Sequence, residues 1–167
     1  MVTDSDLTVL AERLGKHLKK RKLTLTLAES CTGGLCAEII TRVAGSSAWF
    51  DCGFITYSNQ SKQSQLNVSE YILDTYGAVS EETAAEMAMG AYGMSGASLS
   101  AAVTGIAGPS GGSKTKPVGT VCFAWMGIDR ELFTSTHYFK GERLEIRRLS
   151  AKTLIEGLIT LTLSTDL

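Results

Sequence analysis

The sequence predicts an α/β fold in which helices cover a mixed β-sheet. Strand-like segments alternate with segments whose apolar residues recur at helical spacing, an order typical of sheets with helical crossover connections. Near the C-terminal end, two strand-like segments are separated by a short turn, so they can pair directly as antiparallel neighbours. Early strands separated by helices need crossovers instead, and these place parallel strands beside one another.

In the first half of the chain, helical and strand-like segments follow one another with recognisable ends. The expected elements are a helix from about residue 4 to residue 22, a strand at 23–28, a helix at 33–45, a strand at 53–57, short helices at 58–66 and 69–77, and a longer helix at about 81–94. Asp4 or Ser5 can cap the first helix, and Ser80 can cap the last. Gly45 is expected to close the helix that follows the first strand.

The second half of the chain holds three more expected strands and one helix. They are a buried strand at 99–105, a glycine-rich loop at 106–117, strands at 118–128 and 131–139 across the turn Asp129-Arg130, and a final helix with apolar residues from Ile146 to Leu161. The last two strands are therefore expected to pair with each other.

Composition limits the classes of function. The 167 residues, 44% of them hydrophobic, suit one globular domain over residues 1–167, since single domains commonly hold ~100–200 residues. A net charge of −1 and a pI near 6.1 provide no basic surface for nucleic acid, and the basic run at 19–22 is expected to end a helix. The N-terminal segment lacks the layout of a secretory signal, and no stretch approaches the ~20 apolar residues of a membrane span. We therefore expect a cytoplasmic protein without membrane or nucleic-acid partners.

The four cysteines give no sign of a metal site. Cys31, Cys36, Cys52 and Cys122 form no CxxC pair and have no neighbouring histidine. We expect reduced, mostly buried thiols, with neither zinc nor disulfides.

Three loops are candidates for one shared site. "ESCTGG" follows the first expected strand, "YSNQSK" the second and "TGIAGPSGG" the third. In open α/β sheets the reactive crevice lies beyond the carboxyl ends of the strands. These loops would bring together a hydroxyl nucleophile, a tyrosine with a lysine, and a glycine-rich anion cradle.

Ser30 is a candidate nucleophile because it lies at the junction between a strand and a helix, where its hydroxyl can be exposed. Amide groups at the helix N-terminus can stabilise developing negative charge there. A helix-capping serine without a catalytic role is the alternative. Cys31 could be the nucleophile instead, although a cysteine beside a turn more often packs as a small apolar residue.

A serine nucleophile needs a base, and neither His17 in the first helix nor His137 in a terminal strand fits that role. Lys62 lies five residues after Tyr57, within the first turns of the helix that leaves the second strand, so both side chains can reach the crevice. A desolvated lysine can act as a base, and a tyrosine can relay or orient the proton. The alternative is an exposed helix lysine and a strand-end tyrosine.

The loop "GIAGPSGGSKT" comes close to a phosphate-binding P-loop. Counting from Gly108, the pattern GxxxxGK[ST] requires glycine where this chain has Ser113. A glycine-rich loop can still present backbone amides to an anion, or it can be a plain connection. Arg143, Arg147 and Arg148 at the start of the final helix could bind phosphate or carboxylate, or could be solvated charges.

Seven motifs together carry a resemblance to a known family. In chain order they are "AESCTGG", "AGSSAWF", "TYSNQSK", "GAVSEETAAEMA", "TGIAGPSGG", "KPVGTV" and "GERLEIR". The chain resembles the CinA C-terminal domain family, the nicotinamide-nucleotide amidases, over nearly its whole length. The resemblance implies a three-layer α/β/α sandwich with a mixed, mainly parallel central sheet.

The resemblance also implies an activity and a site. It implies hydrolysis of the carboxamide of nicotinamide mononucleotide to nicotinic acid mononucleotide and ammonia, in pyridine-nucleotide salvage, with no metal or organic cofactor and with a homodimeric assembly. The implied catalytic residues are Ser30 as nucleophile, Lys62 as base and Tyr57 as supporting hydroxyl. The implied substrate-binding residues are Thr32, Gly33, Gly34, Thr104, Gly105, Gly108, Gly111, Gly112, Arg143 and Arg147.

Departures from the family pattern keep two other functions open. Gln60 replaces the usual Glu, Ser61 the usual Ala and Glu142 the usual Asp, and Cys52 lies where Gly or Arg is common. Loss of a carboxylate near Lys62 could alter its pKa or geometry. A non-catalytic relative that binds a pyridine nucleotide or a protein partner is therefore the alternative function, and a P-loop-like nucleotide hydrolase is a distant one.

Overall fold

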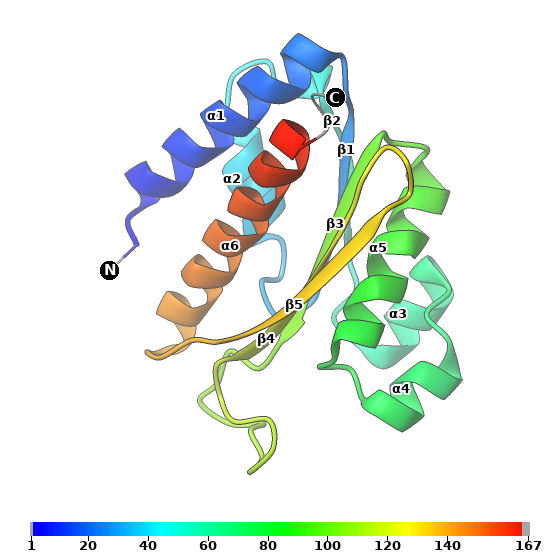
Figure 1. The fold of residues 1–167 in the computed structure, drawn as a ribbon. Helices are drawn as coiled ribbons and strands as arrows, with labels where there is room; N and C mark the ends of the chain where they lie inside the picture. The colour runs from blue at the N-terminus through cyan, green and yellow to red at the C-terminus, as the bar shows by residue number, and fades with distance from the viewer. Residues whose placement is uncertain (1, 165–167) are drawn as a thin grey trace.

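A five-stranded β-sheet with helices on both faces forms the centre of the molecule (Figure 1). The structure, a computed structural model, describes residues 2–164. The strands are β1 (Leu25–Glu29), β2 (Phe50–Ile55), β3 (Leu99–Gly105), β4 (Thr120–Met126) and β5 (Leu132–Tyr138). The helices are α1 (Asp4–Arg21), α2 (Leu35–Thr41), α3 (Asn59–Leu66), α4 (Glu70–Tyr76), α5 (Glu81–Ser95) and α6 (Arg143–Ser164), with a short 3-10 turn, η1 (Ser46–Ala48).

The sheet is mixed, as the sequence predicts. Its strand order is β2-β1-β3-β4-β5. β1 pairs with β2 and β3 in parallel, so Leu27 lies opposite both Gly53 and Ala101, whereas β4 is antiparallel to both of its neighbours. The carboxyl ends of β1, β2 and β3 consequently meet at one edge of the sheet, where the three candidate loops leave it.

The two helical layers pack against different kinds of sheet surface. Helices α1, α2 and α6 cover one face, and α3, α4 and α5 cover the other (Figure 1). The first face buries large side chains such as Leu27 and Phe123. The second face presents Ala28, Ala102 and Ala124 to α5. Such small side chains on the sheet let α5 pack closely over the three central strands.

The ends of several elements differ from the sequence prediction. Thr3 caps α1, in place of the predicted Asp4 or Ser5, because its hydroxyl accepts from the Asp6 amide while the Asp6 carboxylate accepts from the Thr3 amide. β2 begins earlier than predicted, at Phe50.

Helix α2 is shorter than the predicted span 33–45. Gly33 and Gly34 have φ values of +56° and +95°, so the helix cannot begin before Leu35. At the other end, the Thr41 hydroxyl donates to two carbonyl groups of the preceding turn, and the helix stops there. Gly45 precedes the 3-10 turn rather than closing the helix.

A close approach of α3 to α5 depends on Gly90. A Cβ atom added at Gly90 would lie 2.0 Å from the backbone oxygen of Leu66, the last residue of α3, whereas one added at Gly93 would meet nothing within 4 Å. We expect Gly90→Ala to lower the free energy of unfolding by about 1–3 kcal/mol, because α3 must move away. Gly93→Ala, on the same helix, should be neutral or stabilising by up to about 1 kcal/mol. Urea denaturation of both variants checks this, and equal stabilities would contradict the packing described.

Candidate active site

A pocket of about 330 Å³ opens at the carboxyl ends of the three parallel strands. The predicted site residues that line it are Ser30, Tyr57, Lys62, Thr104, Gly105, Gly108, Gly111 and Arg143. They come from the loop after β1, the loop and helix after β2, the end and following loop of β3, and the start of α6. The expectation that the three loops share one crevice is therefore confirmed.

Ser30 and Lys62 form a direct contact at this pocket. Ser30 directly follows β1, and its amide donates to the Val103 carbonyl on the neighbouring strand at 3.0 Å. Lys62 lies in the first turns of α3, as predicted, and its Nζ donates to Ser30 Oγ at 2.9 Å and to the Thr56 carbonyl at 2.8 Å. Ser58 caps α3 and fixes its start. The strand and the capped helix together set the distance between hydroxyl and amine.

Burial changes the acid–base chemistry of Lys62. Its side chain is 1% exposed, and burial lowers the pKa of Lys62 from 10.5 to about 8. A lysine with this pKa has a substantial neutral fraction at mildly alkaline pH. In that form the nitrogen lone pair can accept the Ser30 hydroxyl proton across the existing contact.

The Tyr57 hydroxyl lies away from the Ser30–Lys62 contact. The ring is 61% exposed, and its Oη accepts from Arg143 Nη2 at 3.1 Å. Arg143 Nη1 donates in turn to the Gly108 carbonyl at 2.7 Å. It is the Tyr57 backbone carbonyl that approaches Lys62 Nζ, at 3.4 Å. Tyr57 and Arg143 thus form the outer wall of the pocket, and their side chains take no part in the Ser30–Lys62 contact.

The glycine-rich loop contributes backbone to the pocket but lacks the setting of a P-loop. Thr104 is buried, and its hydroxyl donates to the Ala78 carbonyl at 2.7 Å, which ties β3 to the segment before α5. The pocket wall includes Gly111 but not Gly112. Lys114 is exposed, and the loop leads into β4, whereas a P-loop leads into a helix.

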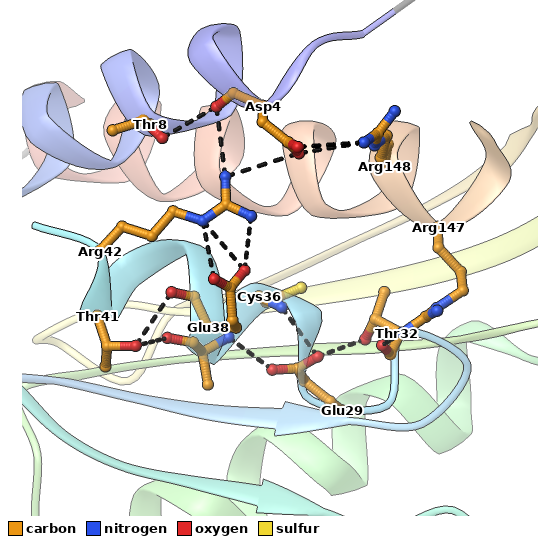
Figure 2. A network of polar contacts seen from close by, with 11 residues as sticks. Asp4, Thr8, Glu29, Thr32, Cys36, Glu38, Thr41, Arg42, Arg147 and Arg148 are labelled. Atoms are coloured by element: carbon orange, nitrogen blue, oxygen red, sulfur yellow. Dashed lines mark hydrogen bonds and ion pairs between the residues drawn. The ribbon is translucent and has the colours of Figure 1, made fainter. Parts of the chain in front are cut away.

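The turn between β1 and α2 is arranged differently from the prediction. Thr32, Gly33, Gly34 and Arg147 do not line the pocket. The amides of Gly34, Cys36 and Ala37 at the start of α2 all donate to the buried carboxylate of Glu29. Figure 2 shows Cys36 beside Glu29. The sequence predicts that amides at this helix N-terminus stabilise an oxyanion. The amides of Gly34, Cys36 and Ala37 do not have that role, because the Glu29 carboxylate accepts from them.

Comparisons with known proteins match this architecture. The family model described as the CinA C-terminal domain matches residues 7–162. The chain is 49% identical to the nicotinamide-nucleotide amidohydrolase PncC of Pseudomonas putida over 93% of this chain and 96% of that protein. It is 47% identical to the protein of the same name in Escherichia coli K12, over 94% and 95% of the two chains.

A solved structure agrees with these sequence matches. The competence/damage inducible protein CihA from Agrobacterium tumefaciens superposes with a TM-score of 0.91 at 43% identity, covering 96% of this chain and 97% of that one. The chain belongs to the CinA C-terminal domain family. Its three-layer α/β/α architecture with a mixed sheet is therefore that of the CinA fold.

Two residues that line the pocket of this CinA domain, Ala78 and Val79, were missed by sequence reasoning about function. Ile106, Ala107 and Ser110 line it from within the predicted glycine-rich loop, and Cys31 also lines the pocket. Ala78 and Val79 belong to the motif "GAVSEETAAEMA". This motif supported the family resemblance, but the sequence indicated no role for it in the site. Burial raises the pKa of Cys31 to about 12, so this thiol is a poor nucleophile.

The departures from the CinA pattern lie outside the Ser30–Lys62 contact. Gln60 is exposed, and Ser61 completes the capping box with Ser58 at the start of α3. Cys52 lies within β2, where its carbonyl accepts from the Thr26 hydroxyl, and Glu142 is exposed. In the part of the chain that the structure describes, the hydrogen bonds of Lys62 Nζ go to Ser30, Thr56 and Tyr57.

Two further findings concern the described residues 2–164. These residues hold no group of three or more His, Cys, Asp or Glu side chains that could bind a metal ion. None of their helices has the length and apolar character needed to cross a membrane.

Proposed function

We propose that this protein is a nicotinamide-nucleotide amidase that hydrolyses the carboxamide of nicotinamide mononucleotide to nicotinic acid mononucleotide and ammonia. The observation that carries the proposal is the buried Lys62 Nζ, 2.9 Å from Ser30 Oγ in a pocket of this size. A hydroxyl paired with a desolvated amine is an activated nucleophile for acyl transfer. The names of the relatives from Pseudomonas putida and Escherichia coli support the same substrate.

In the first half of the reaction, Ser30 Oγ attacks the carboxamide carbon while neutral Lys62 takes the hydroxyl proton. The C–N bond then breaks, and Lys62 returns the proton to the departing nitrogen, which leaves as ammonia. The product of this half-reaction is an ester between the nicotinic acid carbonyl and Ser30 Oγ.

In the second half, a water molecule attacks the ester carbonyl and gives its proton to Lys62. The bond to Ser30 Oγ breaks, and Lys62 supplies the proton that restores the serine hydroxyl. The net change is amide plus water to acid plus ammonia, so no electrons are exchanged and no redox cofactor is needed.

The outer pocket suits the nucleotide phosphate. Arg143 has two nitrogens at the pocket wall, held by Gly108 and Tyr57, and guanidinium binds phosphate with a geometry that lysine cannot reproduce. Gly108 and Gly111 bring the backbone to the pocket without side chains between backbone and ligand. Ala78, Val79 and Ile106 offer apolar surface for the pyridine ring.

The assignment of Arg143 gives a prediction about substrate discrimination. We expect Arg143→Met to raise KM for nicotinamide mononucleotide about ten- to hundredfold, since charge-assisted hydrogen bonds contribute about 1.5–3 kcal/mol. KM for nicotinamide riboside, which lacks the phosphate, should change little. Steady-state ammonia assays with both substrates check this.

Arg148→Met is the matched control, because Arg148 lies on the same helix and pairs with Asp4 on α1. The control should behave as the wild type. If Arg143→Met raised KM equally for both substrates, Arg143 would not be the phosphate ligand.

The experiment that tests the proposed function compares ammonia release by the wild-type protein from nicotinamide mononucleotide and from nicotinamide riboside. Faster turnover of the nucleotide supports the proposal. A folded protein that binds the nucleotide in a calorimeter without releasing ammonia would instead be the non-catalytic relative.

The assembly and compartment are also proposed here. The protein acts as a homodimer in the cytoplasm, an assembly and a compartment that accord with the family resemblance. Light scattering that gave the mass of one 17.8 kDa chain would contradict the dimer.

A further inference from the structure

A buried carboxylate organises the turn that carries Ser30. Glu29 is the last residue of β1 and is 1% exposed. Its Oε2 accepts from the Thr32 hydroxyl at 2.6 Å and from the Cys36 amide at 3.1 Å (Figure 2). Oε2 also accepts from the Gly34 amide at 3.0 Å, and Oε1 accepts from the Ala37 amide at 2.8 Å. All four partners are donors, and an ionised carboxylate is the side chain that accepts from all of them.

These contacts replace a normal helix cap. The residue before α2 is Gly34, which has no side chain to accept from the first amides of the helix. Those amides have no partner within the helix, and that of Cys36 is buried. Glu29 satisfies them from the preceding strand, so the hydrogen bonds span the whole turn in which Ser30 lies.

The same turn is held from its other side by α6. Arg147 Nη2 donates to the Thr32 carbonyl at 2.6 Å, while the Thr32 hydroxyl donates to Glu29 (Figure 2). Thr32 is fully buried between these two partners. Arg147 therefore stabilises the turn and does not line the pocket.

We propose that Glu29 is a positioning residue for the nucleophile, an inference that rests on the proposed amidase function. Its carboxylate fixes the turn, and the turn fixes Ser30 Oγ at 2.9 Å from Lys62 Nζ. A shift of about 1 Å at a reacting group can lower a rate about a hundredfold. Glu29 acts through Ser30 without touching the reacting atoms.

The test compares Glu29→Gln with Glu38→Gln. Both substitutions replace a carboxylate by an amide, but Glu38 lies on the exposed side of α2, paired with Arg42. In Glu29→Gln, the side-chain NH2 must face at least one backbone N–H donor, so the turn shifts. We expect kcat to fall about ten- to hundredfold, with KM for nicotinamide mononucleotide within about twofold of the wild type.

The stoichiometry of nucleotide binding distinguishes a positioning role of Glu29 from a purely structural one. Partial unfolding would lower kcat together with the number of nucleotide sites per chain measured by calorimetry, whereas a displaced Ser30 leaves that number unchanged. Thr32→Val removes a single donor to Glu29 and should show a smaller loss in the same direction. It also provides the test if Glu29→Gln does not fold.

A second readout does not depend on the substrate. The rate at which a fluorophosphonate labels Ser30 should fall in Glu29→Gln and stay at the wild-type value in Glu38→Gln. A wild type that labels at Ser30 but releases no ammonia would remove the proposed function, and the labelling rates would still decide the role of Glu29. Equal kcat and equal labelling rates in the two variants would overturn the positioning role.

Discussion

Replacing Ser30 with alanine is expected to lower ammonia release from nicotinamide mononucleotide by at least about a thousandfold, the scale of loss seen when an enzyme loses its nucleophile. The variant should stay folded. The Ser30 side chain that is replaced is small and buried, and the variant retains the main-chain hydrogen bond from the amide of residue 30 to the Val103 carbonyl. Nucleotide binding should persist, because Arg143 and the glycine-rich loop are unchanged.

Ser110→Ala is the matched control for this prediction. Ser110 also lines the pocket, but it is exposed on the loop after β3 and makes no hydrogen bond with Lys62. Turnover in this control should remain within a few-fold of the wild type. Wild-type turnover in Ser30→Ala would remove Ser30 from the mechanism and with it the acyl-enzyme.

Replacing Lys62 with methionine should lower turnover about a hundred- to ten-thousandfold, the range associated with loss of a general base. Methionine fills most of the same buried volume, and relief of the amine's desolvation cost offsets the bond lost to the buried Thr56 carbonyl, so we expect the free energy of unfolding to change by less than about 2 kcal/mol. Lys114→Met is the control, because Lys114 is exposed on the glycine-rich loop. Equal losses of activity in Lys62→Met and Lys114→Met would argue instead for a P-loop-like reaction at the phosphate, with Lys114 of the glycine-rich loop taking part.

The same assignment predicts the pH dependence. Burial lowers the pKa of Lys62 to about 8, and the neutral amine is the active base. The value of kcat/KM should therefore rise as pH increases toward about 8 and level off above it. The rise should be absent in Lys62→Met. A wild-type rate that falls through this range would show that the protonated form is the active one.

The sequence predicts the fold and the location of the site because both depend on local patterns. Alternating strand and helix segments indicated the parallel strands β1, β2 and β3, and parallel neighbours place their following loops at one edge. The spacing from Tyr57 placed Lys62 on the first turns of α3, which the structure confirms. The seven motifs indicated the family that the comparisons establish.

Features that depend on packing between distant segments were not accessible in this way. The burial of Lys62 depends on α3 packing against α5, including the approach of Leu66 to Gly90. Nothing in the sequence indicates that the Tyr57 hydroxyl faces Arg143, 86 residues away.

The role of Glu29 was missed for a related reason. A glutamate at the end of a buried strand could have indicated a polar network, but its partners are mainly backbone amides. A sequence does not display the positions of backbone amides, so the helix N-terminus looked free to bind an oxyanion.

The most direct test of the central claim is the initial rate of ammonia release from nicotinamide mononucleotide by wild-type protein at about pH 8, with nicotinic acid mononucleotide quantified in the same samples and Ser30→Ala run in parallel. We predict equal amounts of the two products from the wild type and none above background from the variant. Folded wild-type protein that binds the nucleotide but forms neither product would contradict the account.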